Sequence, residues 1–136
     1  MKKLFSFIII SGSALMTSCA FAAANISVTV SDTTPDSILP KIAYYATTEN
    51  GNNMPAGDAE SQCISVGQTA SFKFAALPNV TTYYINAINC NTTNYALDSK
   101  SSGGKITVTN TTSGNYSFNF HCQIANYDGS NNLTCD

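Results

Sequence analysis

His121 is the single histidine of the chain and the one side chain whose ordinary pKa suits proton transfer near neutral pH. It alternates with apolar residues and shares a polar strand face with Asn119 and Gln123. A catalytic role would need a nearby nucleophile or carboxylate, and no serine-hydrolase, phosphate-loop or zinc-protease motif supplies one. A hydrolase pairing His121 with Asp128 or Glu60 is the weakest hypothesis. We expect a solvent-exposed strand histidine in a protein that is not an enzyme.

Two tyrosines are further candidates for binding. The chain has seven tyrosines and no tryptophan, and most should lie in the core or at its rim. Tyr95 and Tyr127 fall on predicted loops, where they could stack on a sugar or a partner protein together with His121. Asp128, Ser130 and Asn132 space their oxygens as a calcium loop does, but a hairpin turn explains the same residues. We expect no metal and no cofactor.

Four cysteines remain once an exported chain has lost its leader, and an even number predicts two disulfides. An Asp128-Gly129 hairpin turn would place Cys122 opposite Cys135 at a non-hydrogen-bonded position, where strands approach most closely. Of the three possible pairings, the sequence therefore favours Cys122–Cys135 with Cys63–Cys90. A zinc site is disfavoured because no Cys-x-x-Cys occurs.

The first residues have the pattern expected of a secretory leader. Two lysines, an apolar run from Leu4 to Ile10 and an Ala20-Phe21-Ala22 exit are typical of a bacterial secretory signal peptide. Residues 1–22 are the predicted signal, with cleavage after residue 22 to 24 and a single domain over 25–136. We expect a secreted, extracellular or periplasmic protein without a transmembrane segment in the mature chain. A lipoprotein anchored through Cys19 is the alternative.

The low charge content of the chain bears on the partners that it could bind. Asp, Glu, Lys and Arg make up 10% of the chain, against about 25% in an ordinary soluble domain. The formal net charge is −2 and no basic patch occurs, which argues against nucleic acid as a partner. Thr, Ser and Asn supply the polarity instead, as in many bacterial surface proteins.

Apolar residues recur every second position in several segments, which predicts strands, and no 3.6-residue period predicts a helix. The predicted strand regions are 25–31, 38–48, 70–76, 83–90, 106–109 and 116–124, with a short element near Tyr95 to Leu97. This pattern indicates an all-β fold. We expect a small disulfide-stapled antiparallel β-sandwich of immunoglobulin-like or jelly-roll type, with a small β-barrel as the alternative.

Two hairpins follow from matching the apolar faces. A turn at Leu77 to Val80 would place Phe74 opposite Tyr83, and a loop ending at Gly114 would place Val108 opposite Phe118. The strand over 83–90 is apolar on both sides, so we expect it at the centre of a sheet or beneath the long loop.

The expected function follows from the scaffold. A rigid exported sheet without a catalytic motif is typical of a non-catalytic binding or interaction module, adhesin-like, effector-like or carbohydrate-binding-like. Its partner would be a protein or a carbohydrate. The alternative is an inhibitor of a host enzyme that acts through the long polar loop Glu49–Gln62.

Overall fold

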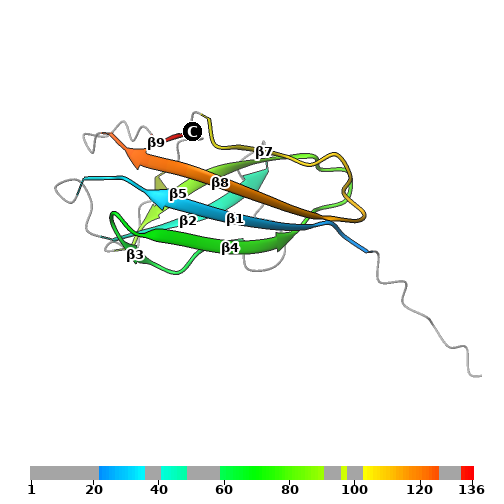
Figure 1. Ribbon diagram of the computed structural model, residues 1–136, viewed down its shortest axis with the longest axis horizontal. Helices are drawn as coiled ribbons and strands as arrows, with labels where there is room; N and C mark the ends of the chain where they lie inside the picture. The colour runs from blue at the N-terminus through cyan, green and yellow to red at the C-terminus, as the bar shows by residue number, and fades with distance from the viewer. Residues whose placement is uncertain (1–21, 36–40, 49–58, 91–95, 98–102, 126–132) are drawn as a thin grey trace, which may run out of the picture.

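Two β-sheets packed face to face form the fold (Figure 1). The computed structural model describes residues 22–35, 41–48, 59–90, 96–97, 103–125 and 133–136, and these contain no helix. The strands are β1 (Asn25–Asp32), β2 (Lys41–Thr48), β3 (Ile64–Ser65), β4 (Thr69–Ala75), β5 (Thr82–Asn89), β6 (Ala96–Leu97), β7 (Lys105–Thr107), β8 (Asn115–Ile124) and β9 (Leu133–Cys135). The predicted all-β sandwich is confirmed.

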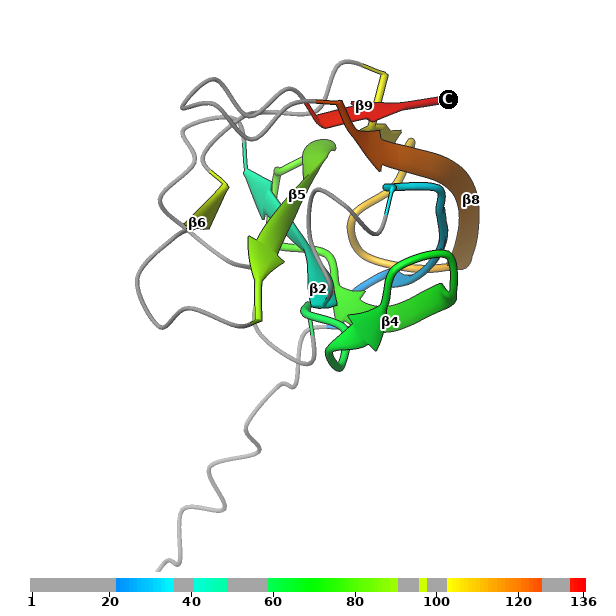
Figure 2. The same cartoon turned by 90° about the vertical axis from the view of Figure 1, so that its left-hand side faces the viewer.

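Sheet A has the order β4-β1-β8-β9, and sheet B has the order β3-β2-β5, with β6 and β7 both pairing with β5. Seen from the end of the sandwich, β2, β5 and β6 form one layer, and β4 and β8 lie in the other (Figure 2). All pairs are antiparallel except β1 with β8, which run parallel. The N-terminal strand therefore lies inside sheet A, between β4 and β8.

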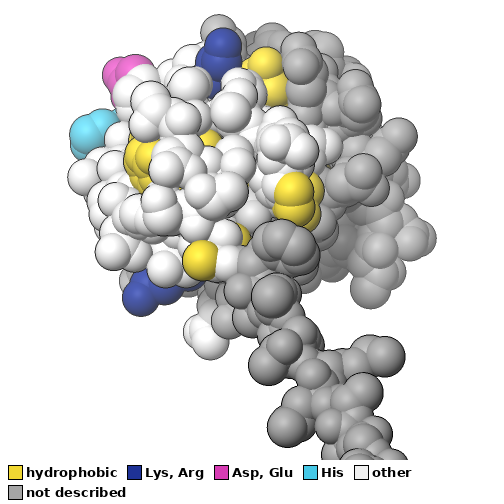
Figure 3. All heavy atoms as spheres, turned by 90° about the vertical axis from the view of Figure 1, so that its right-hand side faces the viewer, with side chains coloured by type: hydrophobic (Ala, Val, Ile, Leu, Met, Phe, Trp, Pro, Cys, Tyr) yellow, Lys and Arg dark blue, Asp and Glu magenta, His cyan; other side chains and the backbone are white. Residues whose placement is uncertain are grey.

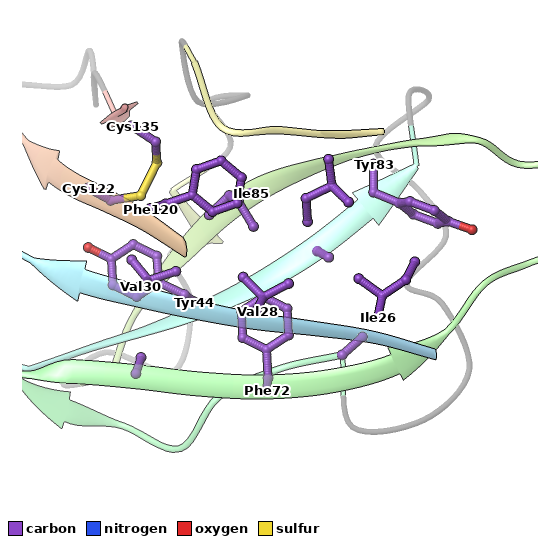
Figure 4. Close-up of a cluster of buried hydrophobic side chains, with 14 of the residues drawn as sticks. Ile26, Val28, Val30, Tyr44, Phe72, Tyr83, Ile85, Phe120, Cys122 and Cys135 are labelled. Atoms are coloured by element: carbon purple, nitrogen blue, oxygen red, sulfur yellow. A yellow bond between two sulfur atoms is a disulfide. The ribbon is translucent and has the colours of Figure 1, made fainter. Parts of the chain in front are cut away.

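The core lies between the sheets, because each strand turns alternate apolar residues inward. Figure 4 shows side chains of β1, β4 and β8 pointing toward those of β2 and β5. The largest side chains with almost no exposed surface are Tyr44, Tyr83, Ile26, Ile42, Ile85, Ile106, Ile124, Leu133, Val28 and Val30. β5 is central in sheet B, as its two apolar faces predicted.

The predicted hairpin between residues 70–76 and 83–90 is wrong. β4 pairs with β1 in sheet A, whereas β5 pairs with β2 in sheet B. Phe74 and Tyr83 do meet, but across the core, with ring centroids 5.0 Å apart at 67°. The crossover between the sheets is held by the Tyr83 hydroxyl, which accepts from Leu77 N at 2.8 Å and donates to Val80 O at 3.0 Å.

The predicted pairing of residues 106–109 with 116–124 is also wrong. β7 pairs with β5, so Ile106 lies beside Tyr83 in sheet B, while β8 lies in sheet A. The connection crosses over the end of the sandwich, where Thr111 O and Gly114 O accept from Ala24 N and Asn25 N at 3.0 and 2.9 Å. Gly114 has the left-handed backbone expected there (φ 103°), but it serves this crossover.

The structure contains the disulfides Cys63–Cys90 and Cys122–Cys135, the connectivity that the sequence favoured. Cys122 and Cys135 are paired in register, with Cα atoms 4.2 Å apart. The neighbouring residues His121 and Asp136 exchange two backbone hydrogen bonds of 3.0 Å, so the cysteines occupy a non-hydrogen-bonded position. The turn at Asp128-Gly129 from which this register was derived lies outside the described residues.

Candidate functional site

His121 lies near the end of β8 and is largely exposed to solvent (70%). Its Nδ1 atom is 3.8 Å from Oδ1 of the exposed Asp136, and such a pair contributes little free energy because water screens it. Both residues line a shallow hollow of about 450 Å³ with Thr33, Gln123, Thr134 and Cys135. Within the described chain, no hydrogen bond joins the imidazole to a hydroxyl nucleophile, and the neighbouring carboxylate of Asp136 is itself exposed (89%).

The other candidates from the sequence fall into two groups. Tyr95, Tyr127, Asp128 and residues 49–58 of the long loop lie outside the described part of the chain. Glu60 is described: its backbone forms an isolated antiparallel β-bridge with Tyr45, and the residue lines a hollow beside β4. Glu60 and His121 thus line separate hollows, and the structure does not bring them together.

A buried carboxylate, that of Asp32, lies at the end of β1, one residue beyond the strand region predicted over 25–31, and was not among the predicted site residues. Asp32 is 3% exposed. Its Oδ1 accepts from the Tyr44 hydroxyl at 2.5 Å, the Thr34 hydroxyl at 2.7 Å and Thr34 N at 3.3 Å. Its Oδ2 accepts from Gly67 N at 2.9 Å. The signal was present, because Asp32 continues the inward spacing of Ile26, Val28 and Val30.

This cluster holds four parts of the sandwich together. Asp32 belongs to β1, Tyr44 to β2 and Gly67 to the turn between β3 and β4, while the Thr34 hydroxyl accepts from Ile124 N on β8 at 3.1 Å. Burial raises the pKa of Tyr44 well above its ordinary value, and the hydrogen bond to Asp32 and its negative charge raise it further. Oδ1 accepts from the buried Tyr44 and Thr34 hydroxyls and Oδ2 from the partly buried Gly67 N–H, so the cluster is a structural tie between the sheets.

The outer face of sheet A is an open surface whose rows of side chains are defined by strand register. We call it the polar face; its side chains are Ser27, Thr29, Ser31, Thr69, Ser71, Lys73, Ser117, Asn119, His121, Gln123, Thr134 and Asp136. Register aligns them in rows across the strands, such as Ser71, Thr29 and Asn119. Neighbouring strands lie about 4.8 Å apart and successive outward residues about 6.7 Å apart. The polar face is thus an array of hydroxyl and amide groups.

Few charges interrupt this array. Lys73 lies at one edge strand, and His121 with Asp136 lies toward the other. Figure 3 shows one end of the molecule, where the described surface is mostly neither charged nor apolar and the histidine lies near an acidic side chain. A ligand on the polar face would therefore meet hydrogen-bonding groups more than charges.

The outer face of sheet B differs. The outward residues of β2 are buried, with Ala43 1%, Tyr45 7% and Thr47 3% exposed. On β5, Asn86 is buried as well, and its amide donates to Thr47 Oγ1 at 2.7 Å. Both faces of β2 are thus withdrawn from solvent. The outer face of sheet B is closed around β2 only, because Tyr84 and Ile88 of β5 are half-buried and Thr107 of β7 is exposed.

A second surface feature lies at the free edge of sheet A. β4 pairs with β1 on one side, and no described strand pairs with it on the other. Beside this edge is a hollow of about 670 Å³, lined by Glu60, Ser61, Gln62, Ile64, Thr69, Ala70, Ser71, Phe72 and Lys73. The hollow separates β4 from the edge of sheet B.

Comparison with models of protein families, with curated proteins and with solved structures gives no match. In the described ranges, no group of three His, Cys, Asp or Glu residues is placed to hold a metal ion. Nor do those ranges include a helix long and apolar enough to cross a bilayer. The class that the fold defines is a small two-disulfide β-sandwich, a structure compatible with an exported protein.

Proposed function

We propose that this protein is an exported, non-catalytic binding module that recognises its partner through the polar face of sheet A. The observation that supports this most is the contrast between the two sheets: the outer face of sheet B is buried around Tyr45 and Thr47, while sheet A presents an open array of hydroxyls and amides. The signal-like N-terminus and the two disulfides support export.

The chemistry of the polar face favours an uncharged partner that is rich in hydrogen-bonding groups. Hydroxyl and amide side chains both donate and accept hydrogen bonds, which matches the hydroxyl groups of a neutral glycan. Short side chains on adjacent strands lose little rotamer entropy when a ligand binds. The array therefore suits many weak, regularly spaced contacts with an extended polysaccharide.

A glycan array probed with the mature protein tests this proposal. Binding to neutral glycans is expected, and silence across the array would contradict it. Asn119→Glu places a charge in the central row, where it should weaken binding at least tenfold because the carboxylate must be desolvated against a neutral ligand.

The matched control is Thr107→Glu. Thr107 is also an exposed strand residue, but it lies on β7 in sheet B. This variant should bind like the unmodified protein. Equal loss in both variants would show that general charge, and not the polar face, controls binding.

A further inference from the structure

We propose that two copies of this chain associate edge to edge through β4, giving a twofold dimer in which their A sheets form one continuous eight-stranded sheet. This proposal does not rest on the proposed ligand. It follows from the free edge of β4, the sequence of that strand and the charges around the adjacent hollow.

Among the strands that the structure describes, none pairs with the second side of the β4 backbone. Ala76 N donates to Ala24 O at 2.8 Å, and Asp32 N donates to Gln68 O at 3.0 Å, which sets the alternation of the β1–β4 ladder. Ala70, Phe72 and Phe74 consequently bond to β1, whereas the N–H and C=O groups of Thr69, Ser71 and Lys73 point away from it. An unpaired edge of this kind is a template for another strand.

The edge lacks most features that prevent such pairing. β4 runs for seven residues without proline, and its register with β1 is continuous from Thr69 to Ala75, without a bulge. Lys73 is the one charged residue of the strand. Natural edge strands are usually shortened, kinked or more heavily charged.

The sequence of β4 complements itself when the strand is paired antiparallel about Ser71. Ser71 then faces its counterpart, and Lys73 faces Thr69 of the second copy, so no like charges meet. On the inward side, Phe72 faces Ala70, which places a large side chain opposite a small one. Three hydrogen-bonded residue pairs would add about six backbone bonds, two for each pair.

The charges beside the edge are also balanced. Among the described residues that line the hollow, Glu60 and Lys73 are the charged ones, and their signs are opposite. Two copies meeting here bring no net charge into the interface, which favours a second copy over a strongly acidic or basic peptide. The dimer would also join two polar faces into one surface, so a polymeric ligand could engage both.

Ser71→Pro tests the interface. The Ser71 N–H faces away from β1, so proline removes a donor needed between copies and none needed within sheet A. Sedimentation velocity of the mature protein from 1 to 200 μM should show a dimer, and Ser71→Pro should raise its dissociation constant at least tenfold. Ser71→Thr retains the N–H and should dimerise normally.

Cross-linking gives an independent measurement in case Ser71→Pro fails to fold. Ser71→Cys should form an intermolecular disulfide readily, because facing residues of a hydrogen-bonded pair have Cα atoms about 5.5 Å apart. Ser117→Cys, an exposed position on β8, should cross-link at least tenfold more slowly. A wild-type protein that stays monomeric at 200 μM, or equal cross-linking of the two cysteine variants, would overturn the proposal.

Discussion

Replacing Asp32 with asparagine tests whether the buried carboxylate cluster ties the two sheets together. An asparagine side chain keeps one acceptor oxygen for Tyr44 and Thr34, but its amide nitrogen would face Gly67 N, which now donates at 2.9 Å. Because the Gly67 N–H is only partly buried, losing its acceptor costs about 1 kcal/mol, and converting two charge-assisted bonds to neutral ones costs about 1 kcal/mol each. The neutral side chain offsets part of this because it is easier to bury. We expect Asp32→Asn to lower the free energy of unfolding by about 2 kcal/mol.

Urea unfolding followed by circular dichroism measures this change. Asp136→Asn is the matched control: Asp136 directly follows β9 and is 89% exposed, so its change should stay within about 0.5 kcal/mol. If both variants unfold at the same urea concentration as the unmodified protein, the cluster does not stabilise the sandwich and this reasoning is wrong.

Three further changes have defined outcomes. Because the pKa of Tyr44 is raised in the folded state, the tyrosine's contribution to stability is fully present below the unfolded pKa of about 10 and declines above it. The stability advantage of the unmodified protein over Tyr44→Phe, measured by urea unfolding, should therefore shrink by about 1.4 kcal/mol by pH 11. A difference that stays constant with pH would refute this. Replacing Cys122 and Cys135 together with alanine reopens a loop with a sequence separation of 13 and should lower stability by about 3 kcal/mol. Removing the Cys63–Cys90 pair should cost a similar amount, and both losses are measured as urea midpoints against the oxidised protein. Unchanged midpoints would show that neither bridge constrains the unfolded chain. Gly67→Ala and Gly103→Ala both strain a left-handed backbone, by about 1–2 kcal/mol. Only at Gly103 would the new Cβ also collide with Cys135 O, so thermal unfolding should show the larger loss there, and equal losses would contradict the packing of Gly103 against β9.

The sequence predicted the local features of this fold well. Cys122 and Cys135 lie on neighbouring strands 13 residues apart, so one turn type sufficed to bring them into register. The inward faces of the predicted strands were also correct, because alternation reports directly which side of a strand is buried.

Strand partners could not be derived in the same way. Phe74 and Tyr83 are both inward, and a matched apolar pattern is satisfied whether the two strands pair within a sheet or face each other across the core. The structure uses the second arrangement, since β4 has β1 as its neighbour. The parallel pairing of β1 with β8 joins residues about 90 positions apart, and no local turn signals such a contact.

The candidate site was predicted least well, for the same reason. His121 was expected on an exposed strand face and lies there, but the rows that join it to Ser31 and Thr69 depend on long-range register. Asp32 was missed because the segment that it forms with Thr33, Thr34 and Pro35 has the composition of a turn. The one indication that Asp32 points into the core is its spacing of two residues from the inward-facing Val30.

The most direct test of the central claim is to map the binding surface by NMR, titrating the isotope-labelled mature protein with a neutral oligosaccharide identified on the array. The account predicts that the largest chemical-shift changes fall on Thr29, Ser71 and Asn119 of the polar face. Changes concentrated instead on β5 and β7 of sheet B, or no saturable change at all, would contradict it.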